Sequence, residues 1–186
     1  MIAAGLQGVD FVVANTDAQS LAASSAEHRI QLGANLTEGL GAGSRPEIGE
    51  AAAEEAIEEI RSHVAGSHMV FIAAGMGGGT GTGASPIIAA QAKEAGALTV
   101  GVVTRPFSFE GTRRAKTADD GIVQLKEKAH TVIVVPNDRL LQSVDKKATI
   151  EDSFRMADDV LRQGVQGVSE VITEPGLINV DFADVR

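Results

Sequence analysis

The sequence predicts an α/β fold in which a doubly wound, mostly parallel sheet carries helices on both faces. Three observations support this prediction. Four apolar runs are nearly continuous in Val, Ile, Leu and Ala, as is typical of strands covered on both faces of a parallel sheet. Helical segments alternate with these runs, which favours right-handed crossovers between parallel strands. A glycine-rich loop at one strand-to-helix junction marks the carboxyl edge of the sheet, where such folds bind ligands.

Each expected element follows from the local sequence. The buried strands are expected at Val9–Ala14, Met69–Ala74, Leu98–Thr104 and Thr131–Pro136, and a short edge strand is expected at Arg29–Leu32. The helices are expected at Pro46–Ala65, Ser85–Ala95, Thr112–Ala129 and Ile150–Ile172. The first of these helices is rich in Ala and Glu, and its proline suits a first helical turn because the missing N–H is not needed there.

Composition narrows the possible function classes. The chain has 186 residues, a hydrophobic fraction of 44% and a formal charge of −9, so we expect a folded domain with an acidic surface. Such a surface repels nucleic acid and anionic lipid, and neither is a favoured partner. The absence of cysteine fits a reducing compartment, and no apolar run approaches the ~20 residues that span a bilayer. With no secretory signal at the N-terminus, these features predict a soluble cytoplasmic domain without direct membrane insertion.

The segment Gly77–Gly83, GGGTGTG, has the composition of a phosphate-binding loop. It holds five glycines in seven residues between an expected strand and an expected helix. Glycine allows positive φ and a close approach of the backbone to a ligand. Free N–H groups and the positive end of the following helix then form a cradle for an anion, to which Thr80 and Thr82 can add hydroxyl donors. We therefore expect a nucleotide at this loop.

Two other kinds of nucleotide loop are less consistent with the sequence. The segment has no lysine of the GK[ST] type, so it is not a P-loop, and charge compensation must come from amides, the helix terminus and Mg²⁺. Gly79, Gly81 and Ala84 match the G-x-G-x-x-A pattern of a dinucleotide site. That reading requires an acidic residue at the end of the next strand, where Thr104 and Arg105 stand instead, so an NAD-dependent oxidoreductase is disfavoured.

Several segments together resemble the tubulin/FtsZ superfamily in its prokaryotic form. GGGTGTG at a strand-to-helix junction is similar to the superfamily signature, and five further segments occur in the family's order. They are NTDAQ at Asn15–Gln19, GLGAGSRPEIG at Gly39–Gly49, TRPFSFEGTRR at Thr104–Arg114, PNDRLL at Pro136–Leu141 and GLINVDFADV at Gly176–Val185. The resemblance implies a Rossmann-like GTPase domain over residues 1–175 and a synergy loop over residues 176–186 that leads to a further domain.

The resemblance also implies which residues hold GTP or GDP. The phosphates would be bound by Ala42, Gly43, Gly77, Gly78, Gly79, Thr80, Gly81 and Thr82. Glu110 would hold the ribose hydroxyls, and Arg114, four residues on, would reach the nucleotide. The guanine ring would stack on Phe154, Asp158 would accept its N1–H and N2–H protons, and Asn137 would add a polar contact. Because adenine has no matching donors, Asp158 should select GTP over ATP.

In the family the synergy loop acts on the nucleotide of the next subunit in a head-to-tail filament. Its polar positions here are Asn179, Asp181 and Asp184, which would polarise the attacking water and help to organise a cation. The resemblance thus implies an assembly-dependent GTPase that forms the division ring in the cytoplasm at midcell, with its own copies and other division proteins as partners. A nucleotide-binding scaffold without hydrolysis is the alternative, and the retained Asn and Asp residues favour the GTPase.

Relative to the family, we expect the chain to lack the first, central strand with its GGGGN-type loop, and the C-terminal domain with its partner-binding tail. In the family's strand order the neighbours of the missing strand would lie roughly 9.6 Å apart, which is twice the spacing between strands. Unpaired backbone groups on two buried edges are costly. We therefore expect the chain on its own to be marginally folded, to bind GTP poorly and to be inactive.

Overall fold

The computed structural model describes residues 2, 9–141 and 149–173. Its strands form two parallel sheets, one of β1 and β2 and one in the order β3-β4-β5. The strands are β1 (Val12–Asn15), β2 (His28–Gln31), β3 (Met69–Gly75), β4 (Leu98–Arg105) and β5 (Thr131–Pro136). All five lie where the sequence predicts a strand, although β1 begins three residues later than expected. The predicted α/β fold class is confirmed.

The helices differ more from their predicted bounds. They are α1 (Ala18–Ala22), α2 (Ala34–Thr37), α3 (Pro46–Glu55), α4 (Ile57–Val64), α5 (Thr80–Glu94), α6 (Thr112–Lys128), α7 (Asn137–Leu140) and α8 (Ile150–Thr173), with a 3₁₀ turn, η2, at Ser108–Glu110. The helix expected at Pro46–Ala65 is two helices, because Ala56 leaves helical geometry with φ −94° and ψ 17°. The helix expected from Ser85 begins five residues earlier, at Thr80, inside the glycine loop.

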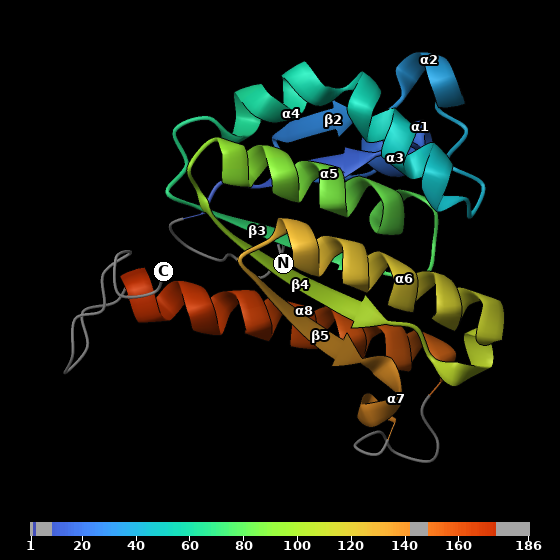
Figure 1. Cartoon of the computed structure of the whole chain (residues 1–186). Helices are drawn as coiled ribbons and strands as arrows, with labels where there is room; N and C mark the ends of the chain where they lie inside the picture. Colours follow the sequence, from blue (N-terminus) through green and yellow to red (C-terminus); the bar gives the residue numbers. More distant parts are fainter. Residues whose placement is uncertain (1, 3–8, 142–148, 174–186) are drawn as a thin grey trace.

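Helices cover both faces of the three-stranded sheet (Figure 1). On one face, α5 and α6 pack onto β3 and β4 through a core that includes Ile72, Val103, Ile122 and Leu125. On the other face, α8 packs onto β4 through a second core made of Leu98, Val100, Val102, Leu161 and Val165. The two-stranded sheet is covered by α3, α4 and α5, so α5 contributes to the packing of both sheets.

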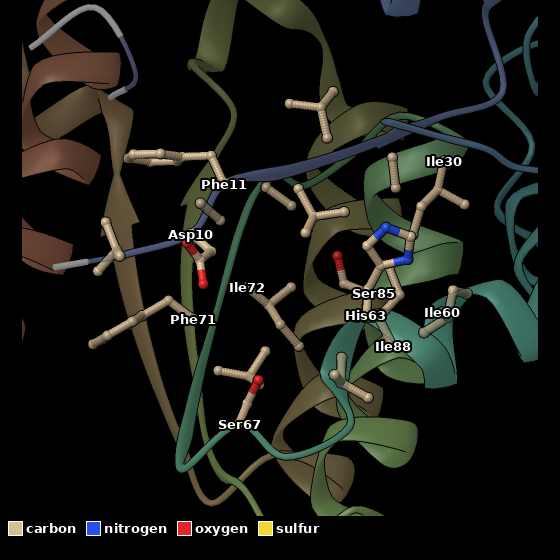
Figure 2. Close-up of a pocket in the computed structure, with 18 of the residues that line it drawn as sticks. Asp10, Phe11, Ile30, Ile60, His63, Ser67, Phe71, Ile72, Ser85 and Ile88 are labelled. Atoms are coloured by element: carbon tan, nitrogen blue, oxygen red, sulfur yellow. The ribbon is translucent and has the colours of Figure 1, made fainter. Parts of the chain in front are cut away.

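A cavity of about 1260 Å³ separates the two sheets. Among the described residues, β1 pairs only with β2, and β3 pairs only with β4, so one edge of each faces the cavity. Figure 2 shows part of its lining, in which Phe11 ahead of β1, Phe71 and Ile72 on β3, and Ile60 on α4 lie together with polar residues such as Asp10. This arrangement agrees with the expected gap in the middle of the sheet.

Part of the prediction lies outside the described residues. The boundary at residue 175 and the loop 176–186, with Asn179, Asp181 and Asp184, belong to that part. Over the ranges that the structure does describe, no helix is long and apolar enough to cross a membrane.

Candidate functional site

The predicted site residues that the structure describes lie on elements that meet at the carboxyl edge of the parallel strands. Asn15 ends β1, Gly75 ends β3, Arg105 ends β4, and Asn137 follows β5 directly. Because all five strands are parallel, the loops that leave them meet at one edge. The glycine loop lies at this edge and leads directly into α5 (Figure 1).

The N-terminus of α5 is open to an anion. Its N-cap is Gly79, which makes no side-chain capping bond, and its first turn carries no acidic residue. The first N–H groups of a helix have no carbonyl partner within the helix, and the dipole of 15 aligned residues adds positive potential at the same place. These backbone N–H groups would donate hydrogen bonds to a phosphate placed there.

The glycines of the loop differ in how closely they are packed by neighbouring atoms. Gly77 has φ 105°, and a Cβ there would lie 2.7 Å from Cγ of Arg114. A Cβ on Gly79 would lie 2.7 Å from Cβ of Ala42. In contrast, a Cβ on Gly78 would meet no atom within 4 Å, so this residue faces open space. Gly77 and Gly79 therefore allow close packing, while Gly78 is at the accessible side of the loop.

Two threonines of the loop take up separate positions. Thr82 is 2% exposed, and its Oγ1 accepts a hydrogen bond of 2.8 Å from the N–H of Gly77. This hydrogen bond fixes the conformation of the loop between Gly77 and Thr82. Thr80 is half-buried, and its Oγ1 lies 2.6 Å from Oγ1 of Thr16, a residue that the sequence analysis did not select.

A second glycine loop, Gly41–Gly43, lies against the first, Gly77–Gly83. Gly41 and Gly43 have φ values of 86° and 59°, in the left-handed region that favours glycine. The N–H of Gly41 donates to the carbonyl oxygen of Thr16 at 3.2 Å, and Ala42 is buried against Gly79. The structure therefore brings together the residues predicted to contact phosphates from both loops.

Glu110 and Arg114 form an ion pair beside the glycine loop. Oε2 of Glu110 lies 3.0 Å from Nε of Arg114, and Oε1 accepts a bond of 2.9 Å from the N–H of Phe107. The Glu110 side chain is only 11% exposed, so the pair is partly shielded from water. Since Arg114 also packs against Gly77, the pair connects η2 to the loop.

Three phenylalanines form an aromatic cluster next to this pair. Phe107 and Phe109 stack with ring centroids 4.9 Å apart, and Phe154 stands edge-on to Phe107 at 5.3 Å. Phe107 is fully buried, whereas Phe154 is 40% exposed and so presents ring surface to a ligand. Of these three, only Phe154 was predicted as a site residue from the sequence. The available signal for the other two was their spacing on either side of Ser108, just before Glu110.

Asn137 is a buried polar residue without a complete set of partners. It is 3% exposed, and among the described residues its Oδ1 has no hydrogen-bond donor. The next residue, Asp138, accepts a bond of 2.9 Å from the N–H of Ser108, which ties α7 to η2. Asp158 is exposed on α8, one helical turn beyond Phe154. The predicted base-binding residues thus lie on neighbouring elements, and an acceptor there lacks a donor.

Arg105 and Asp119 fix α6 to the end of β4. Nε and Nη2 of Arg105 lie 2.7 Å and 2.9 Å from the two carboxylate oxygens of Asp119. The hydrogen bond and charge of the guanidinium lower the pKa of Asp119, and the same contact raises the pKa of Arg105. Arg105 is therefore engaged in a bidentate pair beside the site rather than pointing freely into it.

Asp17 caps α1 at the same edge of the sheet. Its Oδ1 accepts from the N–H groups of Gln19 and Ser20 at 2.9 Å and 3.3 Å. These backbone hydrogen bonds, with one from the Ser20 hydroxyl, lower the pKa of Asp17. Over the ranges with assigned structure, no group of three or more His, Cys, Asp or Glu side chains is placed to hold a metal ion.

Comparison with known proteins agrees with this geometry. The model of the Tubulin/FtsZ family, GTPase domain, matches residues 4–145. Over all 186 residues the chain is 62% identical to the cell division protein FtsZ of Bartonella bacilliformis and 61% identical to FtsZ 2 of Rhizobium meliloti (strain 1021). It spans 31% and 54% of the lengths of these relatives, that is, about a third and about half.

Solved structures show the same relationship in three dimensions. The chain superimposes on the empty FtsZ dimer structure from M. jannaschii with a TM-score of 0.94 and 48% identity, over 99% of this chain and 53% of that one. The more distant CetZ2 from Haloferax volcanii, with a TM-score of 0.75 and 22% identity over 89% of this chain and 51% of its own, shares the fold. With the family model covering more than half of its residues, the chain belongs to the tubulin/FtsZ family.

Proposed function

We propose that this chain binds a guanine nucleotide and that the full-length protein hydrolyses GTP. The observation that carries the proposal is the N-terminus of α5. It begins inside the glycine loop, and it has neither a side-chain cap nor an acidic residue in its first turn. A di- or triphosphate supplies the negative charge that this arrangement favours. Mg²⁺ commonly binds through substrate phosphates and one or two carboxylates, and it would offset the remaining charge in the absence of a P-loop lysine.

The base would lie against the aromatic cluster. Phe154 offers a partly exposed ring for stacking, and Asp158 lies one turn away on the same helix. Guanine presents adjacent N–H donors on N1 and N2, which match a carboxylate, whereas adenine does not. The buried Oδ1 of Asn137 is a further acceptor that a donor on the ligand can satisfy. These groups support guanine over adenine.

Glu110 and Arg114 would act between base and phosphate. Oε1 of Glu110 accepts a hydrogen bond from the N–H of Phe107 and Oε2 is ion-paired with Arg114, so each oxygen keeps a lone pair for a ribose hydroxyl. Cγ of Arg114 packs against Gly77, so its side chain starts beside the loop that would hold the phosphates. The ion pair holds both groups in place before a ligand arrives.

We further propose that hydrolysis is completed by a neighbouring copy. Asn179, Asp181 and Asp184 lie outside the described residues, and family membership supports their action on the next subunit's nucleotide. The carboxylates would orient the attacking water, while amides and Mg²⁺ stabilise charge on the transferred phosphoryl group. A head-to-tail contact of this kind gives open filaments, and the M. jannaschii relative was solved as a dimer. The filament would serve cell division, in the cytoplasm at the division site.

The test is phosphate release by the full-length protein as a function of its concentration, with GTP and with ATP. The proposal predicts GTP-specific release that begins above a threshold concentration, because the active site needs two subunits. A rate strictly proportional to protein concentration would contradict assembly-dependent hydrolysis. GTP binding without release at any concentration would instead indicate a nucleotide-binding scaffold.

A further inference from the structure

One buried threonine contacts the elements that carry both glycine loops. Thr16 follows β1 directly and is 0% exposed. Its backbone carbonyl oxygen lies 3.3 Å from Oγ1 of Thr37, and it accepts hydrogen bonds from Nε2 of Gln31 at 3.1 Å and from the N–H of Gly41 at 3.2 Å. The last of these holds the start of the second glycine loop.

The side chain of Thr16 reaches the first glycine loop. Its Oγ1 lies 2.6 Å from Oγ1 of Thr80, the first residue of α5. Thr16 follows β1 of the two-stranded sheet, and Thr80 follows β3 of the three-stranded sheet by way of the glycine loop. In the described part of the chain no strand pairing joins these two sheets, which we call the two halves of the molecule. This hydroxyl contact therefore crosses between the halves at the edge where the phosphates would bind.

We propose that Thr16 is a positioning residue for the phosphate site and that it fixes the two glycine loops relative to one another. This inference rests on the proposed nucleotide binding. The carbonyl of Thr16 holds Gly41, and its hydroxyl holds Thr80, so one residue sets the spacing between the loops. Amides from both loops can converge on one phosphate chain only when that spacing is kept.

The hydroxyl contact also orients a proton. Each threonine hydroxyl has a single proton, so only one of the two can donate to the other, and Thr80 cannot donate to an anion while its proton is given to Thr16. With Thr16 as the donor, the Thr80 proton is free for the phosphate. Valine at position 16 keeps the side-chain shape and the backbone carbonyl, but it leaves the Thr80 hydroxyl without this partner.

The experiment compares Thr16→Val with Thr16→Ser in the full-length protein. The affinities for GDP and for guanosine are measured by competition against a fluorescent guanine nucleotide. Losing one buried hydrogen bond should weaken GDP binding by about tenfold in Thr16→Val. Guanosine has no phosphates, so its affinity should be unchanged. Thr16→Ser keeps the hydroxyl and should bind GDP within about twofold of wild type.

Thr99→Val provides the matched control. Thr99 is also 0% exposed, and its hydroxyl also makes one hydrogen bond, of 3.1 Å, to the carbonyl oxygen of Ala97. It lies near the start of β4, at the opposite end of the sheet from the site. This variant loses a buried hydroxyl and should keep wild-type affinity for GDP.

Several results would overturn the assignment. Unchanged GDP affinity in Thr16→Val would reduce Thr16 to a packing residue. An equal loss of GDP and guanosine would indicate general damage to the fold, and an equal loss in Thr16→Ser would exclude the hydroxyl as the cause. A wild-type protein that binds neither ligand would overturn the proposed function itself, and this inference with it.

Discussion

At the scale of single residues, the site depends on a few polar groups, and the partners of Glu110 and Thr82 lie within five residues of them in the sequence. Glu110 is occupied by Arg114 and by a backbone N–H, Thr82 is occupied by Gly77, and the Oδ1 of Asn137 has no described donor. Asp158 differs from these because it is exposed. A substitution of Asp158 should therefore disturb the fold less than a substitution of the other three residues.

We predict that Asp158→Asn in the full-length protein lowers the affinity for GTP by about tenfold or more, because two hydrogen bonds to a charged acceptor are weakened. Affinity for ATP should change little, so the preference for GTP should fall. Competition binding with both nucleotides measures this ratio.

Asp159→Asn is the control for that measurement. Asp159 is the next residue and is also exposed, but its carboxylate accepts a hydrogen bond of 2.9 Å from Nε of Arg162 on the surface of α8. Its replacement should leave nucleotide preference as in wild type. If both variants lose the same affinity for GTP and ATP, Asp158 does not recognise the base.

At the scale of elements, strand positions could be predicted well and helix boundaries less well. Four of the strands are nearly continuous apolar runs and were predicted from them, whereas β2, with the sequence HRIQ, was expected as a short edge strand. The early start of α5 depends on tertiary packing, because Gly81 and Gly83 are poor helix formers in isolation. The local sequence gives no signal for the break at Ala56. Thr16 was missed for the same reason, since no local pattern shows that its hydroxyl meets Thr80, 64 residues away.

The contact between α3 and α5 explains why glycine is needed inside a helix. A Cβ on Gly83 would overlap the carbonyl oxygen of Pro46 and lie 2.6 Å from the amide nitrogen of Glu50. We predict that Gly83→Ala destabilises the full-length protein by about 1–3 kcal/mol, because backbone atoms cannot move aside as a side chain can. Denaturant unfolding of the variant and of wild type measures this loss.

Gly167→Ala is the matched helical control. Gly167 lies in α8, and a Cβ there would meet no atom within 4 Å. This substitution should stabilise the protein by up to about 1 kcal/mol, because alanine has the higher helix propensity. If the two variants have the same stability, close packing of α3 on α5 is not the reason for glycine at position 83.

At the scale of the whole molecule, the two sheets are joined through helices and loops rather than through strands. The shared helix α5 packs on both sheets, and the Thr16–Thr80 contact joins them at the ligand edge. Between β1 and β3 the cavity leaves two strand edges without a described partner strand. The proposed nucleotide site lies across this junction, so nucleotide binding and the packing of the two sheets against each other should depend on each other.

Amide exchange in the 186-residue chain should report the gap strand by strand. Successive amides of a parallel strand point to opposite sides, so alternate residues of β3 bond to β4 while the others face the cavity. Exchange measured by NMR should therefore alternate along Met69–Gly75. Residues 100–104 of β4 pair with β3 on one side and β5 on the other, so they should be protected without alternation. Uniform protection along β3 would show that its free edge is paired in solution, and the two halves would then form one continuous sheet.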